Sequence, residues 1–302
     1  MRAGLKEEGR KKGDEYVFHC PKCKHRKPKL SVNVVTDWFN CWICGKEFSG
    51  RTLVKLIAFL YGNKSDELDQ YFAHLEELRG VVKEKPAQEF DEPSLPNGFR
   101  SLSVTSRSLY FKQAIEYLAN RGVSSDDILL YKLGYCEDGE FKNRVIFPSF
   151  DANGELNFAV GRAFYENIPS YKHGNFSKDI IFNDYLIDWD QPIVLTEGPF
   201  DAIKAGENAI PLQGSNLNEG SKLFRKIVTS GVEVYFAMDT DAFAKQLKIM
   251  EVFHHYGVQA NYVNLNGKKD VGVMTKEEFR KAKEAATPIR SDMDLLRLRI
   301  SA

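Results

Sequence analysis

Residues 192–202 read Pro-Ile-Val-Leu-Thr-Glu-Gly-Pro-Phe-Asp-Ala, and residues 232–241 read Val-Glu-Val-Tyr-Phe-Ala-Met-Asp-Thr-Asp. Each stretch is a short apolar run that ends in carboxylates: Glu197 in the first, and Asp239 and Asp241 in the second. Apolar runs of this length predict buried strands, and the segments after them predict helices. In a doubly wound sheet, ligands bind outside the carboxyl ends of the strands. The two stretches therefore predict an α/β domain in which three carboxylates share one crevice.

These carboxylates predict a magnesium or manganese site. Asp239 and Asp241 are two residues apart, so an extended backbone places both side chains on one side. Like charges in one crevice repel each other, and a hard divalent cation with oxygen ligands relieves that repulsion. The alternative is a set of solvated acids at strand ends, which any α/β protein can carry.

The Glu-Gly-x-x-Asp-Ala turn and the later Asp-x-Asp, in this order, resemble the Toprim domain of topoisomerases and primases. The resemblance implies that Glu197, Asp239 and Asp241 are catalytic, with Glu197 either completing the metal site or acting as an acid/base. It implies a further metal ligand at Asp270, although the next residue is Val where the family usually has Pro. Asp201 would cap the following helix or bind metal through water, and Gly214 would let the backbone approach phosphate.

Four of the five cysteines form two closely spaced pairs that predict a zinc site. The pairs are Cys20-x2-Cys23 and Cys41-x2-Cys44, with seventeen residues between them. This spacing is typical of structural zinc, which is held by four thiolates. Disulfides are the less favoured alternative because the sequence shows no secretory signal.

The residues around these cysteines predict a small β domain. Residues 16–21 and 30–34 alternate as short strands do, and residues 37–45 return the chain to the metal. The arrangement resembles the zinc ribbon at the head of DnaG-type primases, which implies that it reads the template. Trp38 and Trp42 are candidates to stack on single-stranded bases. The alternative is that they pack a ribbon too small to have much core.

The middle of the chain continues the resemblance to DnaG-type primases. Residues 117–122 match Tyr-Leu-x-x-Arg-Gly, residues 133–135 match Leu-Gly-Tyr, and residues 144–148 match Arg-Val-x-Phe-Pro. A hairpin turn is expected at residues 151–154. The resemblance implies a basic surface that leads nucleic acid to the metal, made of Arg144, Arg162, Lys172 and Lys178. The alternative for all four is a solvated surface charge.

Length and charge set the domain organisation. The chain has 302 residues, enough for two or three domains. Its 42 basic and 42 acidic residues balance, so nucleic acid would have to bind local patches. Overall we expect an α/β (α+β) protein with five parts: a zinc ribbon with two packing helices (1–80), a linker (81–97), a mixed α/β basic subdomain (98–188), a Rossmann-like Toprim domain (189–274) and a C-terminal helical segment (275–302).

The resemblance runs from about residue 16 to about residue 289 and implies a DNA primase. Such an enzyme makes short RNA primers on a single-stranded DNA template from ribonucleoside triphosphates, by metal-dependent phosphoryl transfer. The short form resembles a bacteriophage primase without the helicase-docking domain, which implies a separate replicative helicase as partner. We expect a cytoplasmic location, in the host if phage-encoded, and no membrane contact, because no apolar run is long enough to cross a bilayer.

Three other classes remain open at this point. A RecR-like recombination mediator also joins four cysteines to a Toprim domain, but it binds DNA without chemistry. A Toprim nuclease would use the same acids to hydrolyse a phosphodiester. A type IA topoisomerase would need a large domain with a tyrosine nucleophile, for which the sequence has no room.

Overall fold

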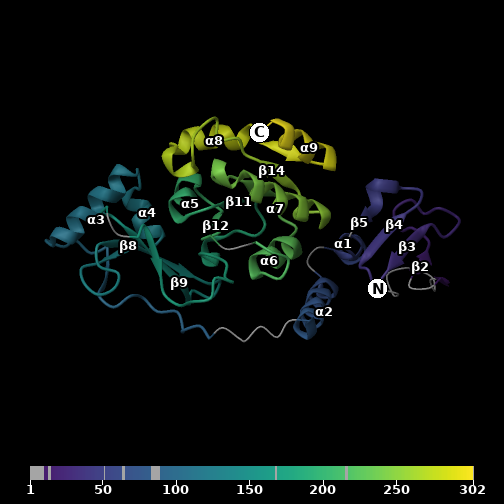
Figure 1. Cartoon of the computed structure of the whole chain (residues 1–302), viewed down its shortest axis with the longest axis horizontal. Coiled ribbons are helices and arrows are strands. Elements are labelled where there is room, and N and C mark those ends of the chain that lie inside the picture. The colour runs from purple at the N-terminus through teal and green to yellow at the C-terminus, as the bar shows by residue number, and fades with distance from the viewer. Residues whose placement is uncertain are drawn as a thin grey trace.

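The computed structural model describes residues 10–12, 15–50, 52–62, 65–82, 89–166, 169–214 and 217–301. Three five-stranded sheets organise this part of the chain. In Figure 1 the N-terminal sheet lies at one end, the sheet that contains β8 and β9 lies at the other, and the third sheet lies between them. The predicted combination of an N-terminal β ribbon with α/β parts is confirmed.

The N-terminal sheet is an antiparallel ribbon with the strand order β1-β2-β3-β4-β5. Phe39 is buried at its centre and meets Phe48 edge to face, with ring centroids 5.3 Å apart. The expected pair of helices follows, and the first of them is capped by Gly62, whose φ of +94° favours glycine. The elements are β1 (Arg10–Lys12), β2 (Glu15–Phe18), β3 (Leu30–Asn33), β4 (Trp38–Cys41), β5 (Ser49–Gly50), α1 (Val54–Tyr61) and α2 (Asp66–Val82).

Helix α2 connects the ribbon to the rest of the molecule. The Tyr71 hydroxyl donates a hydrogen bond of 2.6 Å to Asp37 in the ribbon. The next residue, Phe72, stacks on Tyr256 near the third sheet at 6.5 Å. The linker predicted at 81–97 is described only in part. Its described residues 89–97 contain no helix or strand, and the Asp91 amide donates to the Asn175 carbonyl at 2.9 Å.

The second sheet is antiparallel, with the order β10-β9-β8-β7-β6. The predicted hairpin joins β8 to β9, and the Asp151 amide closes it by donating to the Glu155 carbonyl at 2.8 Å. Two helices, α3 and α4, come between β6 and β7 in the chain. The elements are β6 (Phe99–Ser101), α3 (Leu109–Asn120), α4 (Ser125–Leu130), β7 (Gly134–Cys136), β8 (Arg144–Phe150), β9 (Leu156–Ala163) and β10 (Tyr171–His173).

The third sheet has the order β12-β11-β13-β14-β15, in which the first four strands are parallel. Strand β15 pairs antiparallel with β14. Helices follow the parallel strands, as the alternation of apolar runs and helical segments predicts. The elements are β11 (Ile193–Thr196), α5 (Pro199–Ala205), β12 (Ala209–Pro211), α6 (Lys222–Ser230), β13 (Val234–Phe236), α7 (Phe243–His255) and β14 (Ala260–Tyr262).

The end of the chain differs from the purely helical segment expected at residues 275–302. Helix α8 (Lys276–Glu284) is followed by strand β15 (Thr287–Ile289) and helix α9 (Asp292–Ser301). The third sheet therefore includes residues beyond the boundary predicted at 274. Strand β15 has three residues with Pro288 in the middle, and Pro is tolerated in a strand only at a sheet edge or a bulge. Such a strand leaves no periodic signal in the sequence.

Helix α5 joins the second sheet to the third. Its Phe200 is buried and meets Phe147 of β8 and Tyr117 of α3 edge to face, with ring centroids 5.0 and 6.0 Å apart. The Lys204 amine, also on α5, donates to the Gly122 carbonyl at 3.2 Å. These contacts fix the second sheet beside the carboxyl end of β11. Among the helices described, none combines the length and the apolar composition that a membrane span requires.

Candidate functional site

The four ribbon cysteines come together as the sequence predicts. Their sulfur atoms lie within 4.8 Å of one another. Two of the separations, Cys20 to Cys44 and Cys23 to Cys41, are 3.9 Å. Zinc–sulfur bonds of about 2.3 Å in a tetrahedron give sulfur–sulfur separations of about 3.8 Å. The donor set and its dimensions fit zinc.

The predicted carboxylates also meet at one point. Glu197 directly follows β11, and Asp239 and Asp241 follow β13, which is the parallel neighbour of β11. One carboxylate oxygen from each of these three residues lies within 4.8 Å of the others. Because parallel neighbours end at the same edge of the sheet, this cluster lies in the crevice where α/β proteins bind ligands.

Two oxygens of this cluster have no hydrogen-bond partner among the described residues. Among the described residues, Oε2 of Glu197 and Oδ1 of Asp239 are buried and unpaired. Burial, with the nearby Asp201 and Glu197, raises the pKa of Asp239 from 3.8 to about 7. Unpaired buried oxygens in a cluster of acids are the arrangement that a hard cation completes. The donor set therefore fits Mg²⁺ or Mn²⁺.

The two other acids of the predicted set have partners of their own. Asp270 lines the same crevice but lies outside the three-carboxylate cluster, and it accepts the Val273 amide at 3.0 Å. Asp201 is buried and accepts two backbone amides, from Gly198 at 2.9 Å and from Gly272 at 2.8 Å. Asp201 therefore caps α5, one of the two roles that the resemblance implies.

A basic wall faces the carboxylates across a cavity of about 690 Å³. Arg162 and Lys178 of the predicted set line it, as does Gly214, whose φ is +68°. The Arg162 guanidinium lies over the Tyr171 ring at 4.6 Å and donates to the Tyr117 hydroxyl at 3.2 Å. These contacts aim its charge into the cavity.

Sequence reasoning missed two cations of this wall, Arg121 and Lys269. Arg121 follows α3 and lies over the Phe200 ring at 4.6 Å. The Lys269 carbonyl accepts the Thr240 amide at 3.0 Å, which holds its loop beside Asp239. Arg121 lay within a matched motif and Lys269 beside Asp270, but neither motif indicated that the side chain faces the cavity.

The predicted phosphate-binding role of Arg144 does not fit its position. Arg144 is only 4% exposed and does not line the cavity. Its guanidinium donates to the carbonyls of Pro169 and Ser170, at 2.7 and 3.3 Å. A buried cation that is bonded to backbone carbonyls cannot reach a phosphate without breaking these bonds. Arg144 instead anchors the segment that leads into β10.

The remaining predicted residues lie outside the cavity. Lys172 forms an ion pair of 3.0 Å with Glu140 and does not face the carboxylates. Trp42 is 66% exposed, and its indole donates to the Ser31 hydroxyl at 3.0 Å. Trp38 is half-buried and lines a separate groove between the ribbon and the C-terminal segment, together with Lys22 and Arg290.

The sequence was compared with those of known proteins, and the similar ones are DNA primases. The chain is 22% identical to a DNA primase of Legionella pneumophila over 93% of its own length, and 23% identical to one of Clostridium acetobutylicum over 92%. The chain is similar to DnaG-type DNA primases. It spans 58% and 55% of these two relatives. No family model matches the sequence.

Solved primase structures share the fold. The zinc-binding and RNA polymerase domains of the Aquifex aeolicus primase align with 95% of this chain and 83% of their own, with a TM-score of 0.51 and 19% identity. A DnaG primase catalytic domain bound to single-stranded DNA aligns with 74% of this chain and 81% of its own, with a TM-score of 0.51 and 17% identity. The likeness to DnaG-type primases therefore covers both the ribbon and the carboxylate domain.

Proposed function

We propose that this protein is a DNA primase that synthesises short RNA primers on single-stranded DNA from ribonucleoside triphosphates. The observation that carries the proposal is the three-carboxylate cluster of Glu197, Asp239 and Asp241, of which Glu197 and Asp239 line one cavity together with Arg162 and Lys178. The carboxylates attract divalent metal ions, and the basic side chains opposite them attract phosphates. This combination suits phosphoryl transfer. The four-cysteine ribbon in the same chain distinguishes this arrangement from an isolated Toprim domain.

Each side of the cavity has its own task in this proposal. Primer synthesis joins a 3′-hydroxyl to the α-phosphorus of a nucleotide and releases pyrophosphate. Mg²⁺ at the carboxylates supplies neutralisation of the charge that develops on the phosphoryl oxygens. Glu197 and Asp239 would hold such an ion, since each has a buried carboxylate oxygen that no described residue pairs with. Arg162 and Lys178 bind the triphosphate and keep its α-phosphorus near the attacking hydroxyl.

The template would follow basic and aromatic residues outside the cavity and reach Arg162 at the cavity wall. Trp38 lies in a groove with Lys22, Lys55 and Arg290, a combination of stacking surface and positive charge that suits single-stranded DNA. The related catalytic domain that was solved with single-stranded DNA supports a nucleic-acid template for this chain too. A separate replicative helicase would supply that strand.

The test is incubation of the purified protein with single-stranded DNA, labelled ribonucleoside triphosphates and Mg²⁺. Short RNA products that depend on the template support a primase. Loss of the DNA would indicate a Toprim nuclease, and binding without any product would indicate a RecR-like mediator. Either of these two results overturns the proposal.

A further inference from the structure

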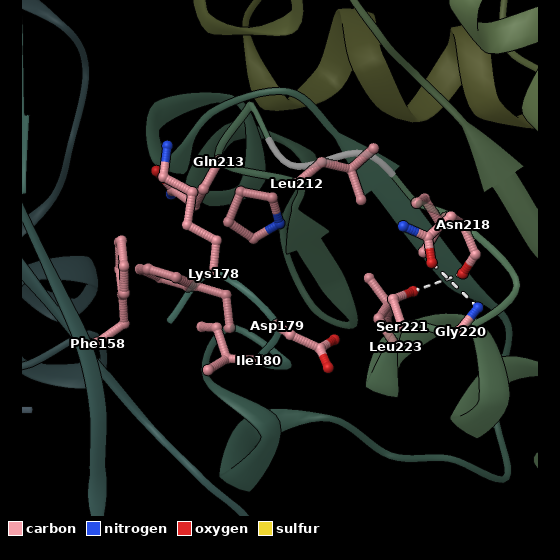
Figure 2. Close-up of a pocket in the computed structure, with 13 residues that line it drawn as sticks. Phe158, Lys178, Asp179, Ile180, Leu212, Gln213, Asn218, Gly220, Ser221 and Leu223 are labelled. Carbon is pink, nitrogen blue, oxygen red and sulfur yellow. Dashed lines mark hydrogen bonds between the residues drawn. The ribbon is translucent and has the colours of Figure 1, made fainter. Parts of the chain in front are cut away.

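A second cavity, of about 570 Å³, opens beside the carboxylate crevice. The two cavities share two lining residues, Lys178 and Gln213. The backbone amide of Gln213 donates to the backbone carbonyl of Glu197 at 3.1 Å, so the shared edge lies next to the proposed metal site. Figure 2 shows Lys178 and Gln213 on one side of this second cavity, and Asn218, Gly220 and Ser221 on the other.

The walls of the second cavity suit a ligand that has an apolar part and a few polar groups. Phe158, Phe182, Leu212 and Leu223 form an apolar lining, and all four are buried. The volume lies within the range of small-molecule sites, roughly 300–1,000 Å³, in which an apolar lining carries a few polar groups. An apolar wall of this kind can cover the faces of a nucleobase.

The polar groups of the second cavity favour an uncharged ligand part over a phosphate. The carboxylate of Asp179 accepts the Lys222 amide at 2.8 Å and so occupies the start of α6 (Lys222–Ser230). Ser221 caps the same helix by accepting the Phe224 amide. A carboxylate placed where a helix would attract an anion repels a phosphate. It can accept hydrogen bonds from hydroxyl or amino groups.

Among the residues that the structure describes, the side chain of Gln213 lacks a polar partner that a ligand could provide. Its φ is +53°, a left-handed conformation that residues other than glycine adopt infrequently. Within the described residues, its side-chain Nε2 is buried and has no hydrogen-bond partner. A buried amide donor left unpaired is costly, and ligand binding is one way to satisfy it.

We infer that the second cavity binds the nucleoside part of a ribonucleoside triphosphate whose phosphates lie at Lys178 and the carboxylates. Lys178 lies at the edge that the two cavities share. In this arrangement it contacts the phosphate that is attached to the nucleoside. This inference rests on the proposed function for the identity of the ligand. It assigns the recognition of the incoming nucleotide to residues that the phosphoryl-transfer chemistry does not use.

The test compares nucleotides with a ligand that has no nucleoside. Calorimetry with Mg²⁺ would measure the affinities of the four ribonucleoside triphosphates and of inorganic tripolyphosphate. Ile180 is half-buried and lines the second cavity, so Ile180→Trp should fill it. We expect the wild-type protein to bind at least one nucleotide about tenfold more tightly than tripolyphosphate. Ile180→Trp should abolish this difference and leave the binding of tripolyphosphate unchanged.

A matched variant keeps the test specific. Val252 of α7 lines another cavity, which shares only Leu217 and Asn218 with the second cavity. Val252→Trp also introduces a tryptophan beside these two residues, but outside the second cavity, and should leave nucleotide binding unchanged. Gln213→Asn tolerates the left-handed backbone and shortens the side chain, and it should weaken nucleotide binding without affecting tripolyphosphate. Thermal unfolding would verify that all three variants fold.

Two results would overturn the inference. One is equal affinity of the wild-type protein for nucleotides and tripolyphosphate, and the other is unchanged nucleotide affinity in folded Ile180→Trp. The outcome is separable from that of the primer assay. A preference for nucleotides over tripolyphosphate that Ile180→Trp abolishes, in a protein that makes no primers, would support the cavity and reject the primase proposal. Primer synthesis by the wild-type protein, together with normal nucleotide binding by Ile180→Trp, would support the primase proposal and reject the cavity.

Discussion

The carboxylate of Asp201 accepts the amide proton of Gly272 at 2.8 Å, across 71 positions of sequence. Its other oxygen accepts the Gly198 amide at 2.9 Å. One buried side chain therefore ties the turn after Glu197 to the loop after Asp270. Asp201 is not a member of the three-carboxylate cluster. It nevertheless holds the loop of Glu197 and the loop of Asp270 at a fixed separation.

We expect Asp201→Ala to destabilise the fold. The substitution leaves two backbone amides without their acceptor, and an unsatisfied buried group costs about 1–3 kcal/mol. Asp201→Asn keeps one carbonyl oxygen and should lose less. Urea unfolding at pH 5 measures both variants while most of the repulsion between Asp201 and its neighbouring carboxylates is absent, because burial raises the pKa of Asp201 to about 6. Equal stability of Asp201→Ala and the wild-type protein would contradict the role of Asp201 as a tie.

The pH dependence of stability should reveal the raised pKa of Asp239. This pKa is about 7 in the folded protein, against an ordinary value of 3.8. The folded state therefore binds a proton more tightly than the unfolded chain, so the free energy of unfolding falls as pH rises from about 4 to about 7. Asp239→Asn lacks this group, and its melting temperature relative to the wild-type protein should rise over the same interval.

Added Mg²⁺ should reverse that trend. Metal binding to the wild-type carboxylates favours the ionised form and stabilises the folded state at pH 7. The variant gains less because it has lost a ligand. Melting curves at several pH values, with EDTA and with Mg²⁺, check both parts. A melting-temperature difference that is independent of pH and metal would show that Asp239 is not in a cluster of repelling acids.

Zinc removal should unfold the ribbon alone. Cys41 is buried among the four sulfurs, and Cys41→Ser removes one thiolate from the set. In small zinc modules the metal supplies much of the folding free energy. We expect the zinc content to fall, and hydrogen exchange to increase within residues 15–50 while the third sheet stays protected. Cys136→Ser, at a buried cysteine outside the cluster, is the control that should keep its zinc.

The two arginines of the predicted basic surface should now behave differently. Arg162 lines the cavity, so Arg162→Ala should lower the slope of log affinity against log salt for single-stranded DNA by about 0.7. Arg144 is buried against two carbonyls, so Arg144→Ala should leave the slope unchanged and cost about 1–3 kcal/mol of stability. Identical slopes for Arg162→Ala and the wild-type protein would make Arg162 a structural residue as well.

The sequence predicted the residues whose position follows from the chain itself. Glu197 and Asp239 end apolar runs, and the geometry of a parallel sheet brings such ends together. The two cysteine pairs needed only their spacing. The roles of Arg144 and Arg121 were missed because they depend on which distant residues pack against these side chains. Nothing in the sequence indicates that the backbone at 169–170 closes over Arg144, or that Phe200 aims Arg121 into the cavity. Strand β15 was missed because its three residues carry no pattern.

The last prediction concerns the chemistry at the carboxylates. Asp239→Asn keeps the size of the side chain but removes a charge from the cluster that would hold Mg²⁺, so primer synthesis should fall by about two orders of magnitude or more. Asp241→Asn and Glu197→Gln should behave alike, because each contributes one oxygen to the same cluster. DNA binding should survive in all three variants, since Arg162 and the ribbon are unchanged. Lys172→Ala is the matched control, because Lys172 pairs with Glu140 outside the cavity and its loss should leave synthesis nearly normal. Near-normal synthesis by Asp239→Asn would place the chemistry elsewhere in the molecule, and the primase mechanism proposed for this cavity would have to be abandoned.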